Sequence, residues 1–180
     1  YNQVQRNTVT DVRYGIHYMY SDDNVFTGNV FEDNIAGAAI MYSRRIELTD
    51  NVFAYNRSAA SGYGILLKDV DDVTIRGNFI HNNRLGLTME GAPQSPQGFV
   101  RLEGNLIGYN QTALELTSTT NATFVRNSFI GNLREVEERG GAVGTHNTWS
   151  EDGRGNYWDS YQGYDAGGDG VGDLPFQYEG

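Results

Sequence analysis

Three side chains near the start of the chain combine soft metal-ligand chemistry with a recurring local context. His17 and Met19 lie two residues apart in GIHYMYS, and Met41 lies in the similar stretch GAAIMYS. The chain has only three histidines and three methionines, so few such groupings are available. Thioether and imidazole groups together favour Cu(I) and bind hard cations poorly. If Met19 and Met41 occupy equivalent positions of a structural repeat, these side chains predict a Cu(I) site.

An asparagine-based repeat runs through most of the chain. The phrase N-x-hydrophobic-x-x-N occurs as NVFEDN, NVFAYN, NFIHNN, NLIGYN and NSFIGN. Its first asparagine recurs in steps of 22, 22, 27, 27 and 22 residues, at Asn7, Asn29, Asn51, Asn78, Asn105 and Asn127. The longer steps coincide with the extra stretches RSAASGYG and EGAPQSPQGF. A fixed internal spacing of this kind indicates one supersecondary unit per repeat.

Alternation of apolar and polar residues predicts that each repeat is built of strands. Segments such as IELTDNVF and VRLEGNLI alternate with a period of two, and none shows a helical period. Short strands, Gly or Asn corners and about 22 residues per coil predict an all-β fold, a right-handed parallel β-helix whose asparagines form a hydrogen-bonded ladder. We expect coils over residues 1–135. Residues 136–180, rich in Gly, Asp and aromatics, are expected to cap the open end.

The repeat predicts the register and the direction of the candidate ligands. Met19 and Met41 each lie ten residues before a repeat asparagine, so they belong to one column of adjacent coils, about 4.8 Å apart. The same column continues with Lys68 and Glu90, which predicts that it faces water. Alternation places His17 on the same side. The third methionine aligns with an apolar column and is expected in the core. An apolar patch for a partner protein, shared with Tyr20 and Tyr42, is an alternative use of this surface.

An acidic, glycine-rich tail offers a second candidate metal site. Asp165, Asp169 and Asp173 recur every four residues between glycines, and oxygen ligands in a flexible loop suit Ca²⁺. The alternative is a turn-rich segment whose carboxylates accept hydrogen bonds from nearby backbone N–H groups. The aromatic residues of this segment are expected to pack it onto the last coil: Trp149, Tyr157, Trp158, Tyr161 and Tyr164.

The composition limits the range of functions. A net charge of −10 at pH 7 argues against nucleic-acid or anionic-membrane partners. The absence of cysteine excludes disulfides, thiolate ligands and cysteine nucleophiles. No stretch approaches the roughly 20 apolar residues that cross a bilayer, and no signal peptide is visible.

Polysaccharide lyases and epimerases provide an enzymatic alternative, because they use acid and base groups that converge in a groove. The candidates are Arg13, Tyr14, His17, Arg44 and Arg45. Against this, the sequence lacks the adjacent Asp–His pair of mannuronan epimerases. The exposed methionines also stand where a sugar site favours polar groups.

The motifs GIHYMYS and MYS, with the tail GRGNYWDSYQGYDAGGDGVGDLPF, resemble the NosD family of periplasmic copper-binding maturation proteins of nitrous oxide reductase. The resemblance covers essentially the whole chain and matches the C-terminal portion of a typical member. It implies a non-catalytic periplasmic β-helix that works with the membrane subunit of an ABC transporter, the copper chaperone NosL and the reductase itself. Carried onto this sequence, the family's copper role falls on His17, Met19 and Met41. At DAGGDG the chain lacks an Asp that relatives tend to carry.

Overall fold

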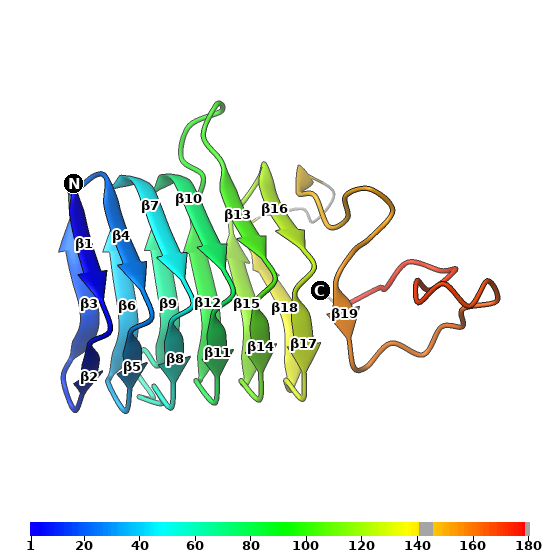
Figure 1. Ribbon diagram of the computed structural model, residues 1–180, viewed down its shortest axis with the longest axis horizontal. Coiled ribbons are helices and arrows are strands. Elements are labelled where there is room, and N and C mark those ends of the chain that lie inside the picture. Colours follow the sequence, from blue (N-terminus) through cyan, green and yellow to red (C-terminus); the bar gives the residue numbers. More distant parts are fainter. Residues whose placement is uncertain (141–145, 179–180) are drawn as a thin grey trace.

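The protein folds as a three-sided parallel β-solenoid, seen in a computed structural model that describes residues 1–140 and 146–178. Each coil contributes one strand to each of three parallel sheets, so a strand is hydrogen bonded to the equivalent strand of the next coil, as β1 is to β4 (Figure 1). The fold predicted from the repeat, a parallel β-helix, is confirmed. In the described part of the chain, no helix has the length and apolar character needed to cross a membrane.

The strands of the three sheets have the following bounds. The first sheet contains β1 (Asn2–Gln5), β4 (Asn24–Thr27), β7 (Arg44–Thr49), β10 (Asp71–Arg76), β13 (Val100–Glu103) and β16 (Ala122–Val125). The second sheet contains β2 (Thr8–Thr10), β5 (Val30–Glu32), β8 (Val52–Ala54), β11 (Phe79–His81), β14 (Leu106–Gly108), β17 (Ser128–Ile130) and β19 (Tyr157–Trp158). The third sheet contains β3 (Tyr14–Met19), β6 (Ala36–Met41), β9 (Tyr63–Lys68), β12 (Leu85–Glu90), β15 (Thr112–Thr117) and β18 (Arg134–Arg139).

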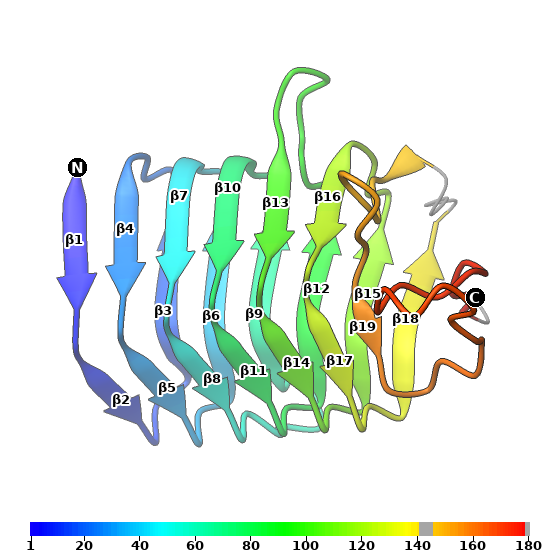
Figure 2. The same ribbon diagram turned by 45° about the vertical axis from the view of Figure 1, so that its right-hand side comes forward.

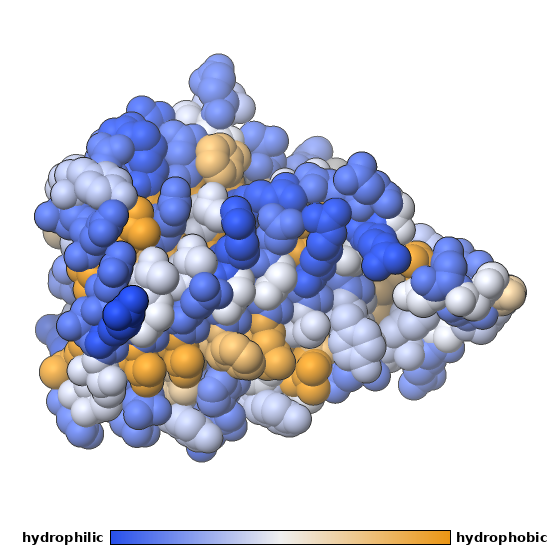
Figure 3. Space-filling model, viewed as in Figure 1, coloured by the Kyte–Doolittle hydropathy of each residue, from blue (hydrophilic) through white to orange (hydrophobic). Residues whose placement is uncertain are grey.

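The interior of the solenoid is filled by the inward side chains of successive coils. Phe31 and Phe53 stack with ring centroids 5.2 Å apart, and their column continues through Ile80, Ile107 and Phe129. All five are at most 1 % exposed. Outward positions of the second sheet are also partly apolar, and they form a band across the face shown in Figure 3, made by Val30, Val52, Phe79 and Leu106.

The repeat asparagines form the predicted ladder at a buried corner. The Asn51 side chain donates to Oδ1 of Asn78 at 3.1 Å and accepts from the side chain of Asn29 at 3.0 Å. A second ladder contains Asn34, Asn56, Asn83, Asn110 and Asn132. Residues that precede the first ladder adopt positive φ, such as Gly28 and Asp50, because the chain turns there and Gly, Asp and Asn tolerate that conformation. Burial requires every amide to have a partner, so the ladders fix the coil register.

The two predicted insertions leave the coils undisturbed. At each insertion, paired residues of neighbouring coils are separated by 27 residues in the sequence instead of 22, as in the pairs Asn51–Asn78 and Asn78–Asn105. The second insertion projects as a loop between β12 and β13 (Figures 1 and 2). It is fastened to the solenoid by the backbone N–H of Ser95, which donates to the buried carboxylate of Asp71 at 2.9 Å.

Stacked aromatic side chains cover the open end of the last coil. Trp149 lies on Phe124 at 4.5 Å between centroids, and Trp158 lies between Phe129 at 4.1 Å and Phe176 at 4.3 Å. These two tryptophans pack on the coil as predicted, whereas Tyr157 and Tyr164 are 60 % and 65 % exposed. Tyr157 faces outward because it precedes Trp158 on β19, and neighbouring residues of a strand point to opposite faces.

The C-terminal segment also continues the solenoid for part of a turn. Asn156 accepts from the backbone and side chain of Asn127 at 3.0 Å, so it extends the first ladder. Strand β18 runs to Arg139, past the predicted boundary at residue 135, and β19 pairs with β17. The predicted cap, residues 136–180, includes 141–145 and 179–180, which lie outside the described residues.

Candidate metal centre

Met19 and Met41 lie opposite each other on neighbouring strands of the third sheet. They are direct partners in the register of β3 and β6, as predicted from their spacing. Both side chains face outward: Met19 is 47 % exposed and Met41 is half-buried. The remaining members of their column follow in the predicted order: Lys68, Glu90 and Thr117. Met89 is fully buried in the neighbouring inward column, also as predicted.

The direction of these side chains is set by a local irregularity at the start of β3. Gly15 and Ile16 both face inward, so Tyr14 and His17 face outward, and Tyr18 and Met19 then alternate. A Cβ on Gly15 would lie 2.5 Å from the carbonyl oxygen of Gly37. Only glycine permits this close approach of two coils, because ordinary Cβ contacts are longer. His17 and Met19 therefore reach the same outer surface.

The imidazole of His17 is held by an aromatic neighbour. Its ring stacks on Tyr14 with centroids 4.6 Å apart and an interplanar angle of 28°. The guanidinium of Arg13 lies 5.2 Å from the centroid of the same tyrosine. The β6 residue opposite His17 is Ala39. We conclude that Tyr14 restricts the orientation of the imidazole, a contact that the outward positions of both rings could have indicated from the sequence.

A second aromatic pair borders the methionines at the corner that follows the third sheet. Tyr20 and Tyr42 stack with centroids 5.1 Å apart, and their φ angles are 54° and 50°. The corresponding corners of later coils carry Asp69, Gly91 and Ser118, which are smaller than tyrosine. A bulky aromatic residue at positive φ is uncommon and costs energy. The two tyrosines extend the apolar surface beside Met19 and Met41.

In the column that contains the methionines, the charges next to Met41 belong to an ion pair. Lys68 lies beside Met41 in the register, and its Nζ is 2.9 Å from Oε2 of Glu90. The hydrogen bond from this ammonium to Glu90 raises the pKa of Lys68 above its usual value. The side chains that β3 and β6 expose beside the methionines carry no permanent charge: Tyr14, His17, Met19 and Met41. Neutral soft donors therefore dominate this part of the surface.

The acidic tail uses its carboxylates to hold its own backbone. Asp165 accepts from the N–H of Gly168 at 2.6 Å and of Gly170 at 2.8 Å. These bonds, that from Gly170 above all, lower the pKa of the Asp165 carboxyl. Asp169 and Asp173 accept in the same way, from Val171 and from Ala166. This is the arrangement of the alternative given above, turns closed by carboxylates, and it lends no support to a calcium site at Asp165, Asp169 and Asp173.

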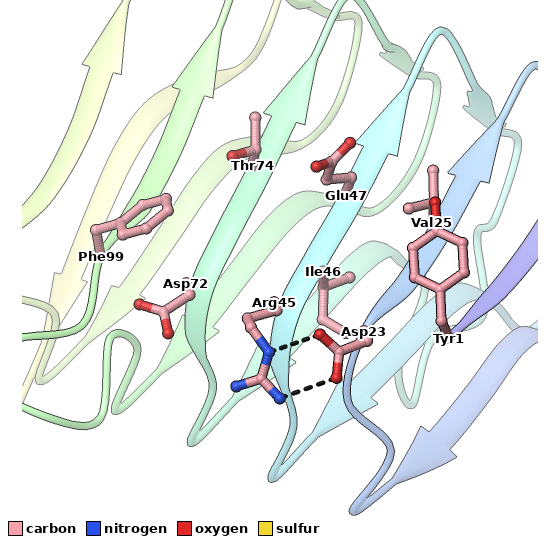
Figure 4. A pocket seen from close by; sticks show the side chains of 9 residues that line it. All are labelled: Tyr1, Asp23, Val25, Arg45, Ile46, Glu47, Asp72, Thr74 and Phe99. Carbon is pink, nitrogen blue, oxygen red and sulfur yellow. Dashed lines mark hydrogen bonds and ion pairs between the residues drawn. The ribbon is translucent and has the colours of Figure 1, made fainter.

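The residues of the enzymatic alternative do not all converge. Arg13, Tyr14 and His17 lie together beside the third sheet, whereas Arg44 and Arg45 begin β7 of the first sheet. Arg45 lines a shallow groove of about 370 Å³ on the outer face of the first sheet, but its guanidinium is held by Asp23 at 2.6 and 2.9 Å (Figure 4). Arg44 is paired with Asp71 at 3.1 Å. Both arginines are thus occupied by carboxylates of the protein itself.

The donor set on the third sheet fits a soft monovalent ion. Two thioethers one strand apart and an imidazole on the same face are ligands that suit Cu(I). Within residues 1–140 and 146–178, no three His, Cys, Asp or Glu side chains gather in a way that could hold a metal ion. The methionine-containing surface remains the candidate.

The fold and this surface together define a β-solenoid with an imidazole and two thioethers on one outer face. A family model described as "Periplasmic copper-binding protein (NosD)" matches residues 1–163. The chain therefore belongs to the NosD family, as the sequence motifs predicted, and the periplasmic location implied by the resemblance is confirmed.

Two curated relatives carry the same name, "Probable ABC transporter binding protein NosD". The protein from Pseudomonas aeruginosa is 30 % identical over 145 residues, which is 75 % of this chain and 32 % of the relative. The protein from Stutzerimonas stutzeri is 31 % identical over 152 residues, 77 % of this chain and 33 % of the relative. The matched region is thus about one third of each relative.

Proposed function

We propose that this protein carries Cu(I) as cargo in the periplasm and acts as a non-catalytic accessory protein. In this role it supports maturation of the copper sites of nitrous oxide reductase, together with the membrane subunit of an ABC transporter and the copper chaperone NosL. The family description, copper-binding and periplasmic, supports the cargo. The name of the two relatives, ABC transporter binding protein, supports the transporter partner.

One observation carries the proposal: Met19 and Met41 are register partners that both face solvent. Parallel strands lie about 4.8 Å apart, so two thioethers in one column can approach the same ion. His17 stands two residues from Met19 on the same strand, roughly 7 Å along it, and its imidazole supplies a third donor. Exposed methionines otherwise carry an unfavourable hydration cost. An open surface site also suits cargo, because a partner protein can reach the ion to deliver or remove it.

The ligand assignment is tested by Cu(I) titration against a colorimetric chelator under anaerobic conditions. The variant Met19→Leu/Met41→Leu keeps side-chain volume and apolar character but removes both thioethers. We expect it to lose Cu(I) affinity by more than about tenfold, the loss typical of removing even an outer-shell partner of a metal. His17→Gln is expected to weaken binding as well, since it removes the imidazole.

Met89→Leu provides the matched control. Met89 is fully buried in the adjacent inward column, so its thioether is out of reach of an ion on the surface. Its replacement should leave the Cu(I) affinity unchanged. If the double leucine variant bound Cu(I) as tightly as the parent, the assignment of Met19 and Met41 would be wrong.

The partner assignment has its own test. Cu(I)-loaded NosL is mixed with the copper-free protein, and copper in each component is measured after separation. We expect copper to move to the parent protein and to remain on NosL with the double leucine variant. Co-elution with the detergent-solubilised transporter membrane subunit tests the second partner. Absence of both transfer and co-elution would leave the protein as a copper binder without these partners.

A further inference from the structure

The column that contains the methionines continues directly into a charged pair. Along the outer face of the third sheet its members are Met19, Met41, Lys68 and Glu90, each the register partner of the next. Neighbouring parallel strands lie about 4.8 Å apart. The Lys68 side chain therefore begins one strand away from Met41, on the side opposite Met19.

The ammonium of Lys68 is directed away from the methionines. Its Nζ lies 2.9 Å from Oε2 of Glu90, which is on the strand beyond it. The two side chains are 38 % and 37 % exposed, so the ion pair lies at the surface and is partly shielded from solvent. In strand order, Lys68 lies between Glu90 and the methionines. Of the two charges of this pair, the positive one therefore belongs to the strand nearer to an ion at the methionines.

Resting on the proposed function, we propose that Lys68 is a specificity-determining residue that favours a monovalent over a divalent ion at Met19, Met41 and His17. Coulomb repulsion is proportional to the charge of the bound ion, so a divalent ion is repelled twice as strongly as a monovalent one. Glu90 tempers this repulsion, because it holds the ammonium toward the far side of its strand. The expected signature is a change in relative affinity and not a change in affinity alone.

The size of the effect follows from the register. Two unit charges roughly 7 Å apart, screened by the dielectric constant of bulk water, about 80, repel enough to weaken binding about threefold. For a divalent ion the factor is squared, to about tenfold. Removing the charge should therefore tighten binding of Cu(I) about threefold and of Cu(II) about tenfold. The preference for Cu(I) then falls about threefold.

Lys68→Gln tests the proposal in the full chain through the reduction potential of bound copper. Loss of the positive charge favours Cu(II) relative to Cu(I), so we expect the potential to fall by about 30 mV, the equivalent of a threefold change for one electron. Raising the salt concentration should shrink the difference, because exposed charges are screened. Titrations with Cu(I) and Cu(II) provide the two affinities separately.

Two controls separate charge from structure. Lys68→Arg keeps the charge and should leave the potential unchanged. Arg139→Gln removes the same charge from the same column, but four strands beyond Met41, and should also have no effect. An equal change in both affinities, or an unchanged potential in Lys68→Gln, would refute the role of Lys68 and leave the copper site standing. If the parent bound no Cu(I), the proposed function and this inference would both fall.

Discussion

Replacement of one buried asparagine tests how the solenoid holds its register. Asn51 is fully buried and makes four hydrogen bonds through its side chain. Its Nδ2 donates to the carbonyl oxygen of Phe26 at 2.9 Å and to Oδ1 of Asn78 at 3.1 Å. Its Oδ1 accepts from the backbone N–H and the side chain of Asn29 at 2.9 and 3.0 Å. Asn51→Ala removes all four bonds.

The magnitude follows from the count of bonds and of groups left without partners. Each buried hydrogen bond contributes about 1 kcal/mol net, which gives about 4 kcal/mol for the four. The backbone N–H of Asn29 then lies buried without an acceptor, and such a group adds about 1 kcal/mol or more. The side-chain amide of Asn29 keeps its bond to Val4. We expect the free energy of unfolding to fall by about 5 kcal/mol, a large part of the stability of an ordinary domain.

Urea unfolding at 25 °C, followed by circular dichroism, measures the change. Coincidence with tryptophan fluorescence, which reports on Trp149 and Trp158, checks that the transition is cooperative. Asn7→Ala is the matched control, because Asn7 is the exposed end of the same ladder and donates only to Gln5 and Asn29. It should cost about 1 kcal/mol or less. Equal losses in the two variants would contradict the idea that buried amide bonds set the register.

Three further predictions concern charge, backbone conformation and the C-terminal segment. Burial raises the pKa of Glu115, whereas a hydrogen bond from a neighbouring guanidinium lowers that of Glu137. A carboxyl group whose pKa is raised by folding destabilises the protein once it ionises, and one whose pKa is lowered stabilises it. At neutral pH, Glu115→Gln should therefore raise the melting temperature and Glu137→Gln should lower it. Both differences should shrink in acid, and shifts of the same sign would refute this reasoning. Ser118 has a φ of 50°, so Ser118→Gly should raise the free energy of unfolding in urea by about 1 kcal/mol. The control Ser128→Gly, in strand β17, should lower it by about 1 kcal/mol. No gain at position 118 would argue against backbone strain there. Trp158→Ala should cost about 3 kcal/mol and expose the C-terminal segment to limited proteolysis, and a protease-resistant variant would show that the stacked rings are dispensable.

The sequence was sufficient for features that repeat. Asn29 and Asn51 recur with the coil, so their spacing predicted the ladder, the register of Met19 with Met41, and the outward direction of that column. The physical reason is that each coil contacts only its neighbours, and one period therefore determines all equivalent contacts.

Features outside the repeat were not predictable in the same way. Asn156 joins the first ladder after a step of 29 residues, a spacing that occurs once. Tyr157 was expected to help pack the C-terminal segment onto the last coil but faces solvent, and the strand that sets its direction is only two residues long. The hydrogen bond between Lys68 and Glu90 depends on two flexible side chains whose positions the register alone does not fix.

The register of β3 and β6 also has a consequence for how such a site can change. The backbone spacing between positions 19 and 41 is imposed by main-chain hydrogen bonding, which follows the same parallel pattern between neighbouring coils. A single substitution in this column, such as Lys68→Met, would thus lengthen the row of sulfur atoms by one step without any rearrangement of the core. On a scaffold of this kind, the position and extent of a soft-metal surface are decided by which residues occupy one column, coil by coil.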